Sequence, residues 1–408
     1  MSGRDPFCPP RRSRSGAGLT LVFVGVLVAG AATGSLPGHE RKSAAAAGRS
    51  APPGYADGPS SGSSAASGPP AAADGHEQVA RAAAEAMAAG KSPMEAAEHA
   101  VSRSGDRWGA VYSPGDFAQF QDSLAGRYTG VGLWARRERD GRIDVMKVQT
   151  GSPAADAGIR AGDRLRSVDG EKVDGLPVTD VVSLLRGDAE GAAAGTSVTL
   201  GLERGTRTWT RTLRRARLST DPVTVRRLAD GTTVIRISAF TRGVGDKVRT
   251  AVRTARPGSG IILDLRGNSG GLVTEAVTTA SAFLDGGLVA TYDVDGEQRA
   301  LHAEPGGDTS RPLVALVDGG TMSAAEMLTG ALQDRGRAVV VGSRTFGKGS
   351  VQMPTRLPDG SVAELTVGHY RTPGGRGVDG RGITPDLDAG RDPVGRARTV
   401  LTGLGDPS

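Results

Sequence analysis

Cysteine is nearly absent from this chain of 408 residues, in which Cys8 is the single one. One cysteine excludes an internal disulfide, a cysteine-ligated metal site and a cysteine nucleophile in the folded part. Aromatic residues make up 4% of the chain, and no basic stripe is interleaved with them. The net charge of +6 is therefore explained by an arginine-rich composition, and we expect no nucleic-acid partner. Nothing in the sequence implies a metal or a cofactor.

Lysine is also scarce, because only six of the 50 basic residues are lysine. One of them, Lys348, lies between two glycines in TFGKGS at 345–350. Arginine keeps its proton in proteins, whereas a desolvated lysine can lose it and act as a general base. Ser323 lies 25 residues upstream (348 − 323) in GGTMSAAE, and Gln352 lies four residues downstream of the lysine. A serine with a neutral lysine as its base is a known nucleophile arrangement, so the pattern predicts a serine–lysine peptidase.

The N-terminus predicts export. Three arginines between positions 11 and 14 precede the uncharged stretch 16–37, whose apolar part from Leu19 to Leu36 has 18 residues. A positive flank followed by an apolar core is typical of a signal peptide or signal anchor, which we assign to residues 1–38. We expect the chain to be anchored in the cell membrane and to face outside the cytoplasm; the alternative is secretion after cleavage.

The next two segments precede the main folded domains. Residues 39–74 are rich in Ala, Gly, Ser and Pro, which predicts a disordered linker. Residues 75–105 form an N-terminal helical segment, with a capping box at Ser92-Pro93-Met94-Glu95. We interpret this segment as a packing or dimerisation element, which leaves homo-oligomerisation open.

Residues 106–217 resemble a PDZ domain, a small β-rich α+β fold. The stretch YTGVGL at 128–133 is similar to the loop with which such domains bind a peptide carboxylate, and 178–186 matches the helix beside the peptide groove. The resemblance implies that the backbone amides of four residues bind the carboxylate: Gly130, Val131, Gly132 and Leu133. The expected partner is the apolar C-terminal tail of a protein, added as an extra strand at the sheet edge.

Residues 218–388 alternate apolar strand patterns with helical patterns. Strands are predicted at 233–238, 260–265, 313–317 and 338–341, and helices at 244–254 and 323–334. Buried strands separated by helices predict an α/β protease core with a mixed, partly parallel sheet. Residues 389–408 are assigned as a C-terminal tail.

The candidate nucleophile follows a strand and a tight turn. This arrangement puts Ser323 at a helix N-terminus, where unpaired backbone amides face a developing oxyanion. The amide of Ala324 is one candidate donor for the oxyanion hole. The glycine-rich turn at Gly270 and Gly271 is the second.

Four motifs in this part resemble the carboxyl-terminal processing peptidases, also called tail-specific proteases, of the S41 serine peptidases. They are IILDLRGNSGG at 261–271, TMSAAE at 321–326, TFGKGSVQ at 345–352 and GITPD at 382–386. The resemblance implies that Ser323 is the nucleophile, that Lys348 is the base and that Gln352 positions the lysine. Asp334 falls where some members have a catalytically important aspartate. The chain departs from the family at Ser269, Met322 and Ala325, and none of these changes removes a functional group.

Two other interpretations stay open at this point. The turn around Ser269 resembles the nucleophile turn of trypsin-like proteases, which also need a histidine and an aspartate upstream. The histidines upstream of Ser269 are at positions 39, 76 and 99, in or near the linker and the helical segment. The second alternative is a PDZ binding scaffold with an inactive protease core. The favoured hypothesis is a serine endopeptidase with a Ser/Lys dyad that binds an apolar tail through the PDZ domain and cuts near it.

Overall fold

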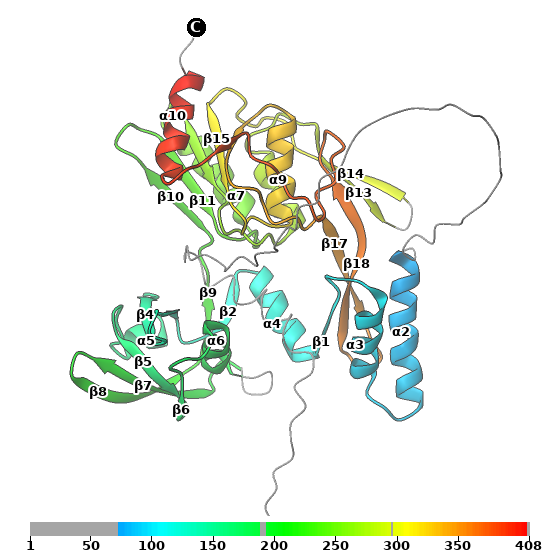
Figure 1. Cartoon of the computed structure of the whole chain (residues 1–408), viewed down its shortest axis with the longest axis vertical. Coiled ribbons are helices and arrows are strands. Elements are labelled where there is room, and N and C mark those ends of the chain that lie inside the picture. Colours follow the sequence, from blue (N-terminus) through cyan, green and yellow to red (C-terminus); the bar gives the residue numbers. More distant parts are fainter. Residues whose placement is uncertain (1–71, 188–192, 295–296, 406–408) are drawn as a thin grey trace, which may run out of the picture.

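The computed structural model describes residues 72–187, 193–294 and 297–405. A helical N-terminal segment, a β-rich PDZ region and an α/β core follow one another along this part of the chain (Figure 1). The predicted signal or anchor at 1–38 and most of the linker at 39–74 lie outside the described residues. Among the helices that are described, none is long and apolar enough to cross a membrane.

A six-stranded sheet forms the centre of the core, in the order β10-β11-β12-β15-β16-β19. Its neighbouring strands run parallel except for β10 and β11, so the predicted mixed, partly parallel sheet is confirmed. The strands are β10 (Val223–Arg227), β11 (Thr233–Ile237), β12 (Ile261–Asp264), β15 (Leu313–Val317), β16 (Val339–Gly342) and β19 (Leu387–Asp388).

Helices cover both faces of this sheet, which explains why its strands are continuous apolar runs. Ile261 and Leu263 of β12 pack into the cluster formed with α7, α8 and α9, whereas Ile262 packs on the opposite face against α10. The helices are α7 (Val244–Thr254), α8 (Val273–Ala280), α9 (Ala324–Asp334) and α10 (Pro393–Gly405). The segment assigned as a C-terminal tail thus contains a helix that packs on the core.

A second sheet is built around β18, which pairs with β1, β13 and β17. Its strands are β1 (Ala110–Tyr112), β13 (Leu288–Val294), β14 (Glu297–His302), β17 (Ser350–Arg356) and β18 (Val362–Arg371). The helices α2 (Ala72–Ala88) and α3 (Pro93–Ser104) lie beside β17 and β18 and bury Val79 and Val101 against Leu365 (Figure 1). The sequence interpretation had placed residues from 106 onward in the PDZ domain, but β1 pairs with β18 of the core.

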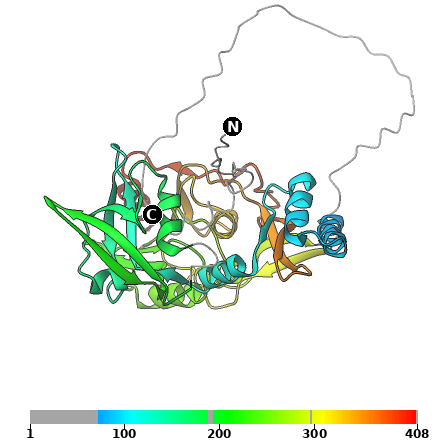
Figure 2. The ribbon, with the colours of Figure 1, turned by 90° about the horizontal axis from the view of Figure 1, so that it is seen from below.

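The PDZ region has its own sheet, in the order β3-β4-β5-β7-β8 with β6 paired to β5. Its strands are β3 (Leu133–Arg137), β4 (Ile143–Val148), β5 (Arg164–Val168), β6 (Glu171–Lys172), β7 (Ser197–Arg204) and β8 (Arg207–Arg214), and its helices are α5 (Pro153–Asp156) and α6 (Val178–Arg186). The connection to the core consists of α4 (Pro114–Leu124) and the pair β2 (Arg127–Gly130) and β9 (Ala216–Ser219). Figure 2 shows the PDZ strands and α2 at opposite ends of the molecule.

The central sheet predicts where a cavity will be most destabilising. Leu263 is fully buried between parallel strands, and Leu263→Ala should lower the free energy of unfolding of the core by about 2–5 kcal/mol. Val225 lies in the same sheet with 51% of its surface exposed, so Val225→Ala serves as the matched control with a change of roughly 0.5 kcal/mol or less. Calorimetric unfolding of the two variants checks this; equal losses would contradict the assigned packing.

Candidate active site

Three loops meet at the carboxyl ends of β12, β15 and β16. Met322 donates its amide to Asn268 O at 2.8 Å, and Phe346 donates its amide to Thr321 O at 3.0 Å. The Thr321 hydroxyl also donates to Leu265 O at 2.9 Å. Because parallel strands deliver their following loops to one edge of the sheet, segments that are far apart in sequence form one surface there.

Ser323 lies at the sharp turn from β15 into α9 in an unusual backbone conformation. Its φ of 55° is positive, and among the described non-glycine residues only Asp169 shares this property. Such a conformation costs about 1–3 kcal/mol and persists where neighbouring groups hold it. The Tyr370 hydroxyl donates to Ser323 O at 3.1 Å, and the Met327 amide donates to the same oxygen at 3.0 Å. A serine fixed on a strained strand-to-helix turn is typical of an exposed nucleophile.

The glycine turn after β12 lies against this serine. A Cβ atom at Gly270 would be 3.0 Å from Ser323 Cβ and 2.9 Å from Met322 O, so only glycine fits there. The Gly270 amide already donates to Asn268 Oδ1 at 2.9 Å. Within the described chain, the amides of Gly271 and Ala324 donate no hydrogen bond. Of the three candidate oxyanion donors, these two are therefore the available ones.

A buried carboxylate links the serine turn to the lysine loop. Glu326 is fully buried, and its Oε2 accepts the amides of Ser323 at 2.9 Å and Lys348 at 2.8 Å. Its Oε1 accepts the Gly347 amide at 2.7 Å and the Thr345 hydroxyl at 2.5 Å. Burial raises the pKa of Glu326, and these four donors act in the opposite direction. One side chain thus fixes the backbone of both candidate catalytic residues.

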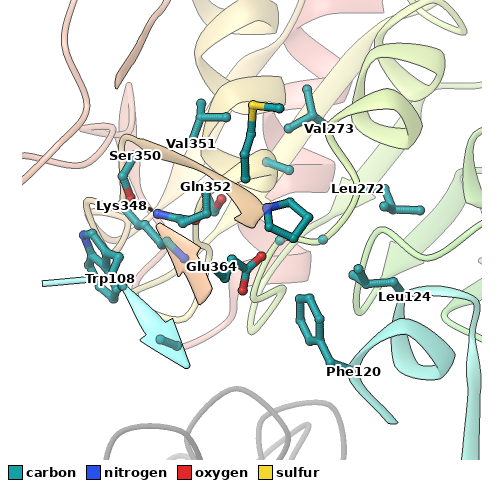
Figure 3. Close-up of a pocket in the computed structure, with 18 of the residues that line it drawn as sticks. Trp108, Phe120, Leu124, Leu272, Val273, Lys348, Ser350, Val351, Gln352 and Glu364 are labelled. Carbon is teal, nitrogen blue, oxygen red and sulfur yellow. Dashed lines mark hydrogen bonds between the residues drawn. The ribbon is translucent and has the colours of Figure 1, made fainter. Parts of the chain in front are cut away.

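The Lys348 side chain is 5% exposed. Its Nζ lies 4.9 Å from the centroid of the Trp108 ring, and Figure 3 shows it between Trp108 and Glu364. Burial lowers the pKa of Lys348 to about 8, although the charges of Glu364, Asp106 and Asp379 oppose this change. A lysine with this pKa is partly neutral near physiological pH and can accept a proton.

Gln352 lies beside the lysine on β17 (Figure 3). Its Nε2 donates to Ser350 Oγ at 2.7 Å and to Thr366 Oγ1 at 3.4 Å. Among these described side chains, Ser323 Oγ makes no hydrogen bond with either Lys348 or Gln352. The three candidate residues are brought to one cavity but are not hydrogen-bonded to one another.

The cavity that they share has a volume of about 1190 Å³. Its wall contains Ser323, Lys348 and Gln352 together with apolar side chains such as Leu272 and Val273. Ser269 also lines it, but no histidine is among the described lining residues, which argues against a trypsin-like site. In the described part of the chain, no group of three or more His, Cys, Asp or Glu side chains is arranged to hold a metal ion.

Asp334 is not brought to the site. It ends α9, the helix that starts next to Ser323, and ten helical steps separate the two ends by about 15 Å. Its carboxylate accepts the Gly374 amide at 2.8 Å and pairs with Arg376. The sequence assignment of Asp334 to the catalytic set therefore finds no support in the geometry, because this aspartate instead holds the turn after β18.

The predicted carboxylate loop lies in the PDZ region, outside the cavity. Gly130 ends β2, and Leu133 begins β3, an edge strand that pairs only with β4 among the described strands. Within the described residues, the amides of Val131 and Gly132 donate no hydrogen bond. The loop thus has unused donors next to an open strand edge.

Several residues at the site were missed by sequence reasoning. Glu326 belongs to a motif that was recognised, and its position three residues after Ser323 is a capping-box signal that could have assigned it. Trp108 and Glu364 approach Lys348 from segments far away in sequence, and no local pattern marks them.

Comparisons with known proteins agree with this geometry. Residues 231–389 match the model of peptidase family S41, and residues 145–204 match that of the PDZ domain. The chain is 35% identical over 307 residues to carboxyl-terminal-processing peptidase 3, chloroplastic, of Arabidopsis thaliana, covering 70% of this chain and 58% of the relative. It is 32% identical over 275 residues to the carboxy-terminal processing protease CtpA of Bacillus subtilis, covering 66% and 58%.

A solved structure, the photosystem II D1 C-terminal processing protease, is 30% identical and has a TM-score of 0.49; the match covers 77% of this chain and 86% of that one. The chain spans a little over half the length of the two curated relatives above. On these matches, the chain belongs to peptidase family S41, among the carboxyl-terminal processing peptidases that carry a PDZ domain.

Proposed function

We propose that the chain is a serine endopeptidase in which Ser323 is the nucleophile and Lys348 the general base. The observation that carries this proposal is the buried lysine: its pKa is lowered to about 8, and it lines the same cavity as a serine on a strained turn. Neither feature is needed for folding alone, and together they fit the needs of an activated nucleophile.

The reaction follows from these groups. Neutral Lys348 takes the hydroxyl proton of Ser323 while Oγ attacks the scissile carbonyl carbon. The amides of Ala324 and Gly271 bind the resulting oxyanion. The C–N bond then breaks, and Lys348 gives its proton to the leaving amine. Water, deprotonated by Lys348, hydrolyses the acyl-enzyme and restores Ser323.

Gln352 is proposed to hold the amine of Lys348 toward Ser323 during this reaction. Its carboxamide is beside the lysine and is bonded to the hydroxyls of Ser350 and Thr366. Those partners are neutral and exchangeable, so a rotation of the side chain is enough to exchange them for the amine.

The substrate is proposed to be an unfolded chain with an apolar C-terminal tail. A cavity of about 1190 Å³ is larger than one side chain requires, and the walls near Leu272, Val273 and Met327 are apolar. In the PDZ region, the free amides of Val131 and Gly132 suit a terminal carboxylate, and the open edge of β3 suits an added strand.

Export is proposed from the sequence of residues 1–38, with membrane anchoring preferred to secretion. We propose no nucleic-acid partner, and a homo-oligomer through the helical segment at 75–105 is left to measurement.

Cleavage of an unfolded reporter with an apolar tail tests the nucleophile. Ser323→Ala should lower kcat by at least about 10³-fold because the attacking oxygen is gone. Ser269→Ala, on the same cavity wall, should stay within a few-fold of the unsubstituted chain. Loss of cutting in Ser269→Ala alone would reverse the assignment, and an inactive unsubstituted chain that still binds the tail would favour the PDZ scaffold.

Substitution of Lys348 tests the general base. Lys348→Arg should be as inactive as Lys348→Ala, since arginine retains the positive charge but cannot accept a proton. The measurement is kcat on the same reporter, with Lys147→Arg in the PDZ region as the matched control. Near-normal turnover by Lys348→Arg would sink the general-base role.

Glu326→Gln tests the link between the serine turn and the lysine loop. A carboxamide cannot accept four hydrogen bonds through two oxygens, so both catalytic backbones should shift and kcat should fall by about 10²-fold. Glu275 is the matched control, because its carboxylate also accepts two backbone amides, from Gly243 and Gly245, outside the site. Glu275→Gln should lower the melting temperature without lowering kcat; equal kcat in both variants would refute the positioning role of Glu326.

A further inference from the structure

Lys348 occupies a site built mostly by residues from outside its own loop. Trp108, from the segment between α3 and β1, places its ring 4.9 Å from Lys348 Nζ. Glu364 approaches from β18 (Figure 3). Asp106 is held nearby, because its carboxylate accepts the Trp108 amide at 3.0 Å and the Thr366 hydroxyl at 2.8 Å. We refer to Trp108, Asp106 and Glu364 as the ammonium site.

The ammonium site is suited to a positive charge. An aromatic face attracts a cation, and desolvation strengthens this attraction. Glu364 is deeply buried, and no arginine or histidine in the described chain forms an ion pair with it. Its described hydrogen-bond donor is the Tyr112 hydroxyl, at 3.3 Å. A buried carboxylate that lacks such a partner is costly unless a nearby charge compensates it, and Lys348 is the cation that does so.

The surrounding titratable groups have been considered from every neighbouring element. They are Asp106 before β1, Tyr112 on β1, Glu326 on α9, Glu364, His369 and Tyr370 on β18, and Asp379 before β19. Glu326 is engaged by the backbone amides, and Asp379 accepts the Gly349 amide at 3.0 Å. Glu364 is named first among the charges that favour protonated Lys348, so it is the group to vary.

We propose that Glu364 is a positioning residue which, with Trp108 and Asp106, holds the ammonium form of Lys348 away from Ser323, and that loss of the proton to water releases the amine toward the serine. The proposal rests on the proposed function of Lys348. It explains why the two residues line one cavity without a hydrogen bond between them. A neutral amine has no charge for the ring face or the carboxylates to attract, so protonation and position of the base change together.

The same arrangement gives the N-terminal segment a part in catalysis. Trp108 and Asp106 precede β1, which is paired with β18 next to Glu364. Displacement of this segment would remove two of the three members of the ammonium site without touching the Ser323 turn. The base is therefore controlled from a different side than the nucleophile.

Direct titration of Lys348 in the full chain tests the proposal. Lysines labelled with ¹³C at Cε give few signals, because the chain has six, and Lys348→Arg identifies the signal by its loss. In the unsubstituted chain the midpoint should lie near the pKa of about 8. Glu364→Gln removes a charge that favours the ammonium, so the midpoint should fall by about one pH unit. Glu297→Gln, on an exposed strand, is the matched control and should leave it unchanged.

Two further readings separate position from structure. The Lys348 Cε protons should show an upfield ring-current shift below the midpoint that disappears above it, and Trp108→Leu should abolish that shift at every pH. In kinetics, kcat/KM should rise with pH through the Lys348 midpoint, and Glu364→Gln should move this limb to lower pH. At pH 7 a midpoint change from about 8 to about 7 corresponds to roughly a fivefold gain in neutral amine.

An unchanged midpoint in Glu364→Gln, or a ring-current shift that persists above the midpoint, would overturn the proposal. If Glu364→Gln does not fold, the ring-current comparison between the unsubstituted chain and Trp108→Leu still decides it. Failure of the proposed function looks different: Ser323→Ala would then retain cleavage, whatever the titration of Lys348.

Discussion

The active arrangement depends on one buried carboxylate. Glu326 accepts backbone amides from Ser323 at the start of α9 and from Gly347 and Lys348 in the loop after β16. These two segments have no covalent reason to lie together, and each brings unpaired amides into a dry interior. A single side chain satisfies them, which both stabilises the junction and fixes the catalytic backbones relative to each other. The strained φ of Ser323 is tolerated because this network surrounds it.

The lysine raises the opposite problem. A general base must be desolvated to lower its pKa, yet a buried ammonium needs compensation whenever it carries its proton. The ring of Trp108 and the carboxylate of Glu364 provide that compensation without a direct, short ion pair, which would hold the proton permanently. The result is a pKa of about 8, between that of a solvated lysine and that of a fully buried unpaired one.

The sequence predicted the scaffold better than the environment of the site. Strand β15 and helices α6 and α7 were located residue for residue, because apolar periodicity and turn residues determine them locally. Ser323, Lys348 and Gln352 were predicted to share one site, and they line one cavity. Trp108 and Glu364 could not be predicted, since they reach Lys348 through the pairing of β1 with β18 across more than 250 residues. The same pairing explains why the PDZ boundary was placed too early, and Asp334 shows that a position shared with relatives does not establish proximity.

The connection between the PDZ region and the cavity is covalent and short. Helix α4 begins two residues after β1, which is anchored in the core sheet, and ends three residues before β2, which pairs with β9. Phe120 and Leu124 of this helix line the same cavity as Ser323 (Figure 3). The end of α4 is also bonded to the core, because the Arg242 amide donates to Leu124 O at 3.0 Å. One wall of the catalytic cavity is thus the element that joins the peptide-binding region to the core, so any rotation of that region about its attachment must move α4 relative to Ser323 or break this bond.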